Sequence, residues 1–162
     1  MRRIFLLALA VGVAISGVSR PGFAQKAMTA KHSTDAVAID KAYLQKIWDG
    51  WGALDPAAQK QYYAQGPHVF FDIAPLKYAS WDEYQSGVTK ELAEFKAARF
   101  ALNDDLQIHK SGDAYWVTAT LTYDMTHKSG KRDMGNMRWT AVFEKIDGKW
   151  LIVHEHVSEP LS

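Results

Sequence analysis

Apolar residues recur at helical spacing in the first half of this chain and alternate with polar residues in the second half. The helical spacing predicts helices over residues 35–51, 55–63 and 80–98. A capping box, Ser80-x-x-Glu83, marks the start of the third helix. The chain from residue 35 to about residue 98 is therefore expected to be mainly helical.

Alternating apolar and polar residues predict a short strand first and then a series of longer ones. An Asp147-Gly148 pair lies between two apolar segments near the C-terminus, which is the strongest short-range signal of a β-hairpin. Helices followed by antiparallel strands indicate the α+β class, with the helices packed on one face of a strongly curved sheet. The predicted strand regions are residues 68–73, 99–110, 114–126 and the closing hairpin 136–160.

The length of the hairpin turn decides which side chains share a face of the sheet. A two-residue turn places Trp139 on the same face as His154 and His156. A three-residue turn shifts the pairing by one residue, so that Trp139 shares a face with Glu155 and Arg138 joins the histidines. The sequence leaves both alternatives open, and either Glu155 or the histidine pair faces the interior.

The N-terminal residues have the layout of a secretory signal peptide. Two arginines precede an apolar run over about residues 4–15, and small residues surround a cleavage site expected after Ala24. An uncleaved membrane anchor is the alternative, although the run is short for a membrane span. We expect a signal peptide over residues 1–24, a flexible leader over 25–34 and a single domain over 35–162. The protein would then be periplasmic or secreted.

Charge and cysteine content exclude several classes of function. Cleavage after Ala24 removes three arginines and leaves 16 basic and 18 acidic residues. This slightly negative chain gives no electrostatic reason to bind nucleic acid or an anionic membrane. The chain has no cysteine, which excludes disulfides, thiolate metal sites and a cysteine nucleophile. No phosphate-binding or dinucleotide-binding glycine pattern occurs, so no cofactor is expected.

The closing segment resembles a known family. The run WLIVHEHVS at residues 150–158, after the R-x-T-x-V of residues 138–142, resembles the SnoaL-like branch of the nuclear transport factor 2-like superfamily. Residues 51–84 and 111–161 are similar to the helical passage and the sheet of the same proteins. The resemblance implies a cone-shaped α+β barrel, commonly a homodimer, with a pocket between the concave sheet and the N-terminal helices. Relatives include ketosteroid isomerases, polyketide cyclases and dehydratases, and also proteins without known catalysis.

Asp72 is the main candidate for acid–base chemistry, because it is the only charge in an apolar strand. The alternative is that it caps the loop at Ala74 or pairs with a lysine. His154 and His156 could polarise a substrate beside it. The two histidines could also share one face of a strand and bind zinc, but no third ligand follows at a suitable spacing, so no metal site is expected.

Aromatic and polar residues with pocket-forming potential complete the set of candidates. Arg138 could hold a substrate carboxylate or enolate, or it could pair with Glu155 or Glu159. The candidate ligand-binding residues are Tyr43, Trp48, Trp51, Tyr78, Arg138, Trp139 and Glu155.

These residues favour a domain that binds a small apolar or amphipathic molecule in an aromatic pocket. The alternative is a cofactor-free isomerase, cyclase or dehydratase that uses Asp72 as its general acid or base. Binding alone is favoured because no second carboxylate is evidently partnered with Asp72, as acid–base pairs require. A third possibility is a dimeric scaffold in which Trp139 and its neighbours fill the cone.

Overall fold

The computed structural model describes residues 38–161. The predicted signal peptide and leader lie outside the described residues. The elements are α1 (Lys41–Gly52), α2 (Pro56–Gln59), the 3-10 helix η1 (Lys60–Tyr62), β1 (Phe70–Phe71), α3 (Trp81–Leu92), β2 (Phe95–Leu102), β3 (Gln107–Ser111), β4 (Ala114–His127), β5 (Arg132–Ile146) and β6 (Lys149–Ser158).

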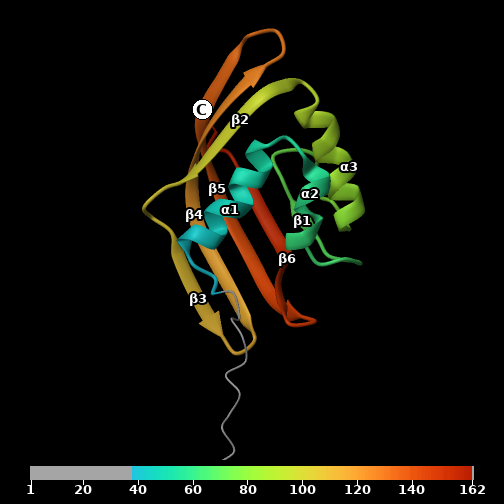
Figure 1. Ribbon diagram of the computed structural model, residues 1–162, viewed down its shortest axis with the longest axis vertical. Helices are drawn as coiled ribbons and strands as arrows, with labels where there is room; N and C mark the ends of the chain where they lie inside the picture. The colour runs from blue at the N-terminus through green and yellow to red at the C-terminus, as the bar shows by residue number, and fades with distance from the viewer. Residues whose placement is uncertain (1–37, 162) are drawn as a thin grey trace, which may run out of the picture. The chain divides into compact units, whose positions relative to one another are not determined.

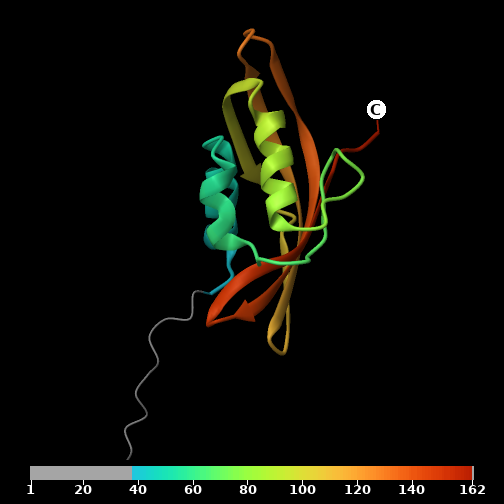
Figure 2. The same cartoon turned by 90° about the vertical axis from the view of Figure 1, so that its right-hand side faces the viewer.

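The strands form one curved sheet in the order β1-β6-β5-β4-β2, and β3 pairs with β4 beyond the end of β2. Strand β1 runs parallel to β6, and the other pairs are antiparallel. The helices all lie on one face of this sheet (Figures 1 and 2). The predicted α+β class is confirmed, and the sheet is curved but not closed.

Helix α1 begins later than its apolar spacing predicts. The Asp40 side chain caps it by accepting a 2.8 Å hydrogen bond from the backbone N–H of Tyr43, so the helix starts at Lys41 rather than at residue 35. Its buried face carries Leu44 and Trp48 toward the sheet. Asp40 itself has an extended backbone, so the helix cannot extend back through it, and its carboxylate caps the first turn.

Helix α3 begins where the capping box predicts and ends earlier. Ser80 Oγ accepts the backbone N–H of Glu83 at 3.2 Å, while the Glu83 carboxylate accepts the N–H of Ala79 at 2.8 Å. The helix ends at Leu92, and Phe95 already pairs with β4 as the first residue of β2. The prediction of a helix to residue 98 was therefore wrong, because Phe95 satisfies a helical spacing and also begins a strand.

The closing hairpin combines both predicted registers. Asp147 and Gly148 have positive φ angles of 49° and 79°, as a two-residue turn requires. Farther from the turn, a bulge leaves Val153 without a partner and shifts the pairing by one residue. Beyond the bulge, Trp139 shares the concave face with Glu155. The pairing expected for a two-residue turn thus holds near the turn. Beyond the bulge, the face assignment is the one expected for a three-residue turn, with Trp139 and Glu155 on one face.

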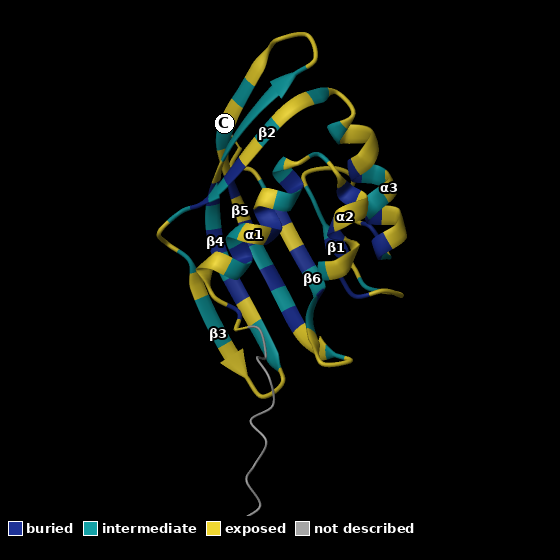
Figure 3. Ribbon diagram, viewed as in Figure 1, coloured by how far each residue is buried: buried dark blue, intermediate teal, exposed yellow. Residues whose placement is uncertain are grey.

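The core lies where the helices cross the concave face of the sheet (Figure 3). Aromatic rings dominate it: Trp48 packs edge-on against Trp139 with ring centroids 5.5 Å apart, and Tyr63 stacks on Trp81 at 4.5 Å. None of the helices that the structure describes has the length and apolar character needed to span a bilayer.

Candidate functional site

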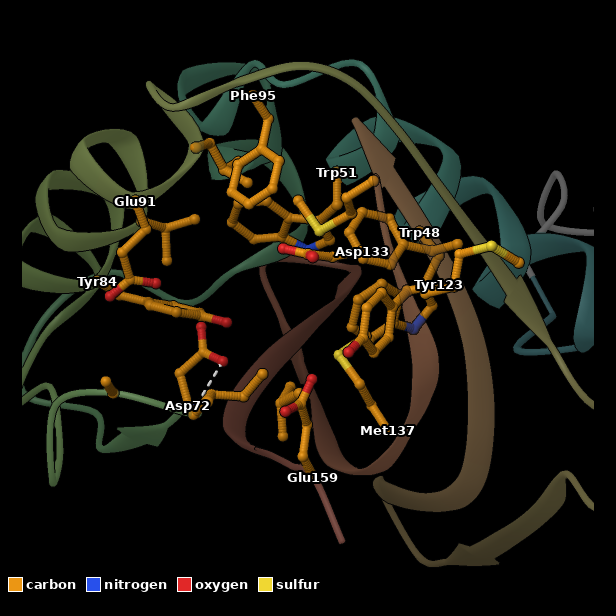
Figure 4. A pocket seen from close by; sticks show the side chains of 18 of the residues that line it. Trp48, Trp51, Asp72, Tyr84, Glu91, Phe95, Tyr123, Asp133, Met137 and Glu159 are labelled. Carbon is orange, nitrogen blue, oxygen red and sulfur yellow. Dashed lines mark hydrogen bonds between the residues drawn. The ribbon is translucent and has the colours of Figure 1, made fainter. Parts of the chain in front are cut away.

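A cavity of about 570 Å³ lies between the helices and one end of the curved sheet (Figure 4). The walls are largely aromatic and aliphatic, which suits the burial of an apolar molecule. Core packing therefore leaves space, and Trp139 does not fill the cone. The apolar lining residues are Trp48, Trp51, Ile73, Ala74, Tyr84, Val88, Leu92, Phe95, Phe100, Tyr123, Met125, Met134, Met137 and Val157.

Asp72 lines the cavity just after β1. Phe70 is a strand residue that pairs with Glu155. Side chains alternate along a strand, so Asp72, two residues after Phe70, points to the same side of the sheet as Phe70. The Asp72 carboxylate accepts a 2.7 Å hydrogen bond from the backbone N–H of Ile73, so it also holds the loop. Burial raises the pKa of Asp72, while hydrogen bonds from Ile73 and Tyr84 act in the opposite direction.

Glu155 lies beneath the cavity, with only 1% of its surface exposed. The carboxylate accepts hydrogen bonds from the Tyr84 hydroxyl at 2.7 Å, the Tyr63 hydroxyl at 3.0 Å and the Trp139 indole N–H at 3.0 Å. Burial raises the pKa of Glu155 to about 7, and these three donors limit the rise. Glu155 is therefore a buried carboxylate that can change protonation state near neutral pH.

Tyr84 connects the two carboxylates. Its hydroxyl bonds Glu155, and it points toward Asp72 at the cavity wall (Figure 4). Burial and the nearby charges of Asp72 and Glu155 raise the pKa of Tyr84, so this group stays a neutral phenol. The network continues through Tyr63, whose hydroxyl accepts the indole N–H of Trp51 at 3.1 Å. Such a chain can redistribute protons beside a bound molecule without a cofactor.

The structure brings three of the candidate residues to the cavity: Asp72, Trp48 and Trp51. Trp139 and Glu155 do not line it, but each contacts a residue that does: Trp139 packs against Trp48, and Glu155 accepts the Tyr84 hydroxyl. Tyr43 lies apart, where its ring packs edge-on against Tyr62 and its hydroxyl makes a long 3.4 Å bond to a backbone carbonyl.

Tyr78 supports the cavity rim from behind. The hydroxyl donates toward the backbone carbonyl of Ala74 at 3.1 Å and the carboxylate of Glu91 at 3.3 Å, and both of these residues line the cavity. Burial and nearby carboxylates raise the pKa of Tyr78 well above its ordinary value. This tyrosine holds lining residues in place rather than lining the cavity itself.

The structure does not bring the histidines to Asp72. His154 and His156 lie on the opposite face of β6 from Glu155, with their rings edge-on to Phe71. His154 Nδ1 is 2.8 Å from the backbone carbonyl of Val69. The bulge in β6 turns Glu155 inward and both histidines outward, which corrects the expectation that they polarise a substrate.

Arg138 also lies on the outer face, exposed to solvent, and its Nη1 donates a 3.4 Å bond to the backbone carbonyl of Glu159. It therefore does not reach the cavity as a fork for a substrate carboxylate. Among residues 38–161, no three histidine or acidic side chains gather as a metal-binding group.

Sequence reasoning missed Tyr63, Tyr84 and Glu91. The available signal was Glu155 itself, because a carboxylate within an apolar strand needs hydrogen-bond donors if it faces the core. Trp139 on the neighbouring strand was one candidate donor. The other two donors are Tyr63, which directly follows η1, and Tyr84 of α3. Only the folded arrangement brings them to Glu155.

Comparisons with known proteins agree with the architecture. A family model described as the SnoaL-like domain matches residues 42–162. A comparison with curated proteins found no match. A nuclear transport factor 2-like superfamily protein from Salmonella enterica is similar in structure, with a TM-score of 0.67 and 20% identity over 75% of this chain and 92% of that one.

Two further solved structures are similar at the same level. One, from Xanthomonas campestris, is provisionally named a calcium/calmodulin-dependent protein kinase II association domain; it has a TM-score of 0.64 and 23% identity over 74% of this chain and 84% of that one. The other, from Streptomyces avermitilis, is provisionally named a dehydratase of the NTF2-like family; it has a TM-score of 0.64 and 15% identity over 75% and 95%. At these identities, the likenesses establish the fold alone.

Proposed function

The chain belongs to the SnoaL-like domain family, and from that premise we propose that it binds a small, largely apolar molecule bearing one polar group. The observation that carries this proposal is the aromatic cavity of about 570 Å³ with a carboxylate in its wall. This volume falls within the range of small-molecule sites, roughly 300–1,000 Å³. The apolar body would pack against Trp48 and Trp51, and the polar group would meet Asp72.

Isothermal titration calorimetry with 2-naphthylmethanol, a neutral bicyclic probe, tests this binding. Leu92→Trp should weaken the affinity at least tenfold, because Leu92 lines the cavity and the larger ring would occupy it. The matched control is Leu151→Trp, a half-buried leucine outside the lining, which should stay within about twofold. Equal effects of the two substitutions, or no binding by the unmodified protein, would contradict the proposal.

Acid–base catalysis is the second candidate function, and the Asp72–Tyr84–Glu155 network favours it. Asp72 would take a proton from the carbon beside a carbonyl group and return it at another position, or assist a dehydration. Tyr84, whose hydroxyl also bonds the buried Glu155, would stabilise the ionised Asp72 carboxylate. The network also supplies a second carboxylate near Asp72, which the sequence did not reveal.

Deuterium exchange at the α-carbon of 2-tetralone in D₂O, followed by proton NMR, tests this chemistry. Asp72→Asn should reduce the protein-dependent exchange rate at least a hundredfold, because an amide cannot accept the proton. The control is Asp113→Asn, an exposed carboxylate outside the cavity lining, which should leave the rate within about threefold. An unchanged rate in Asp72→Asn would exclude Asp72 as the base.

We also propose that the chain is exported, cleaved after Ala24 and active as a homodimer in the periplasm or outside the cell. The support is the sequence of residues 1–24 and the fold family. Expression of the full chain in a bacterium with two membranes, followed by N-terminal sequencing of the periplasmic fraction, should give Gln25 as the first residue. Sedimentation equilibrium should then give twice the mass of the processed chain.

A further inference from the structure

We propose that the polar group of the bound molecule is a cation, either a protonated amine or a quaternary ammonium. The cavity would then select organic cations over neutral and anionic molecules of the same shape. This inference rests on the proposed binding function and adds the chemical class of the ligand. It follows from the charged side chains that line the cavity and from their partners.

Among the described residues that line the cavity, Arg132 is the only basic one, and it is already paired. Arg132 faces Asp124 across the β4–β5 hairpin, where its Nε donates to Oδ1 at 2.6 Å and its Nη2 pairs with Oδ2. The Asp124 carboxylate balances the charge of this guanidinium. Among the described residues that line the cavity, no basic side chain lacks an acidic partner.

The lining contains four carboxylates, and one of them is neutralised. Asp133 has Lys131 Nζ at 2.8 Å and His127 Nε2 at 2.5 Å. The other three, Asp72, Glu91 and Glu159, have no basic partner among residues 38–161. They come from three different segments of the chain and lie along one side of the cavity, opposite Trp48 and Tyr123 (Figure 4).

Neutral groups hold these three carboxylates in place. Asp72 accepts a backbone N–H and Glu91 accepts the Tyr78 hydroxyl at 3.3 Å. Glu159 lies beside the Tyr123 hydroxyl and raises the pKa of that tyrosine to about 12. Hydrogen bonds from neutral donors fix the carboxylates without cancelling their charge. The negative charge remains directed at the cavity, where apolar walls screen it less than water would.

Repulsion within the cavity gives a cation its advantage. Burial raises the pKa of Glu91, and the charge of Asp72 raises it further, as expected of two carboxylates that repel each other when both are ionised. A cation between them would replace repulsion by attraction. The rings of Trp48, Trp51 and Tyr123 would also attract a cation through their faces. A carboxylate ligand would meet repulsion from all three unpaired groups.

Three naphthalene probes with one apolar body test the inference: 2-naphthylmethylamine, 2-naphthylmethanol and 2-naphthoate. Calorimetric titration at neutral pH and low salt should give the amine a Kd at least tenfold lower than that of the alcohol. The naphthoate Kd should be at least tenfold higher than that of the alcohol. High salt should reduce the amine preference and leave alcohol binding nearly unchanged.

Substitutions at the rim should separate charge from shape. Glu91→Gln and Glu159→Gln should each weaken amine binding three- to tenfold and change alcohol binding less than twofold, because glutamine keeps the size and a hydrogen-bond acceptor. The matched control is Glu94→Gln, an exposed carboxylate three residues after Glu91 and outside the lining, which should change neither affinity.

The outcomes distinguish this inference from the binding function beneath it. Equal affinities for the amine and the alcohol, or tighter binding of the naphthoate, would overturn the inference and leave the proposed binding function in place. A preference for the amine that survives both rim substitutions and also Asp72→Asn would overturn it, because the three named carboxylates would not be its cause. No binding of any probe would overturn both.

Discussion

At the scale of single residues, Glu155 should make stability depend on pH. The folded protein keeps the Glu155 proton up to a pKa of about 7, whereas the unfolded chain releases it near the ordinary value of 4.5. The favourable contribution to folding is therefore complete below pH 4.5 and is lost as the pH rises to about 7. The loss amounts to about 3–4 kcal/mol at most.

Urea unfolding between pH 4.5 and 8 measures this effect. The free energy of unfolding of the unmodified protein should fall relative to that of Glu155→Gln as the pH rises, because glutamine binds no proton. Glu94→Gln serves as the control and should follow the unmodified protein across the range. A constant difference between the protein and Glu155→Gln would show that Glu155 has an ordinary pKa.

Tyr84 should contribute more to stability than a tyrosine whose hydroxyl is weakly bonded. Tyr84→Phe removes a 2.7 Å bond to a fully buried carboxylate and should cost about 2 kcal/mol of unfolding free energy. Tyr43→Phe removes only a 3.4 Å bond and should cost less than about 0.5 kcal/mol. Equal losses in thermal or urea unfolding would contradict the role of Tyr84 as a principal donor to Glu155.

Some site residues could be predicted from the sequence because their local pattern carries the information. Trp48 and Trp51 follow from the spacing of one helix, and Asp72 follows from its position as a lone charge in an apolar run. The donors to Glu155 could not be predicted, because they come from separate elements whose meeting depends on the folded sheet. The outward direction of His154 and His156 was equally hidden.

At the scale of elements, α3 contains a glycine that the packing requires. A Cβ at Gly87 would lie 2.3 Å from the Tyr78 hydroxyl and 2.6 Å from its ring carbon Cζ. Glycine to alanine normally stabilises a helix interior by up to about 1 kcal/mol. Here Gly87→Ala should instead destabilise the protein by about 1–3 kcal/mol, because Tyr78 must move and lose its bonds to Ala74 and Glu91.

Urea unfolding measures the change, with Ser86→Ala as the control in the same helix. Ser86 is exposed, so its replacement should stabilise the protein slightly through helix propensity. If Gly87→Ala instead increased the free energy of unfolding, Tyr78 would be able to move away from the helix without a loss of stability.

The elements themselves were more predictable than their registers. Periodicity identified α1 and α3, and the Asp-Gly pair identified the closing hairpin but left open whether its turn has two or three residues. The bulge left no mark, because residues 151–153 are Leu-Ile-Val and any of them could be the extra residue. The end of α3 was hidden for a similar reason, since Phe95 suits both a helix face and a strand.

At the scale of the whole molecule, the fold should not need the predicted leader of residues 25–34. Helix α1 receives its cap from Asp40, which lies within the described residues. A chain starting at Asp35 should therefore unfold with a free energy within about 0.5 kcal/mol of one starting at Gln25. Thermal and urea unfolding of the two chains measure this, and a loss above about 1 kcal/mol would show that the leader contributes to the fold.

The packing of the tryptophans has a consequence for spectroscopy. Indole rings lie close enough to interact optically in two pairs, Trp48 with Trp139 at 5.5 Å and Trp51 with Trp81 at 6.3 Å. One member of each pair also lines the cavity. A guest that tilts either ring would change the coupling of the paired transitions, and with it the near-ultraviolet circular dichroism. The near-ultraviolet circular dichroism of the protein itself should therefore report whether a molecule occupies the cavity, without an attached dye.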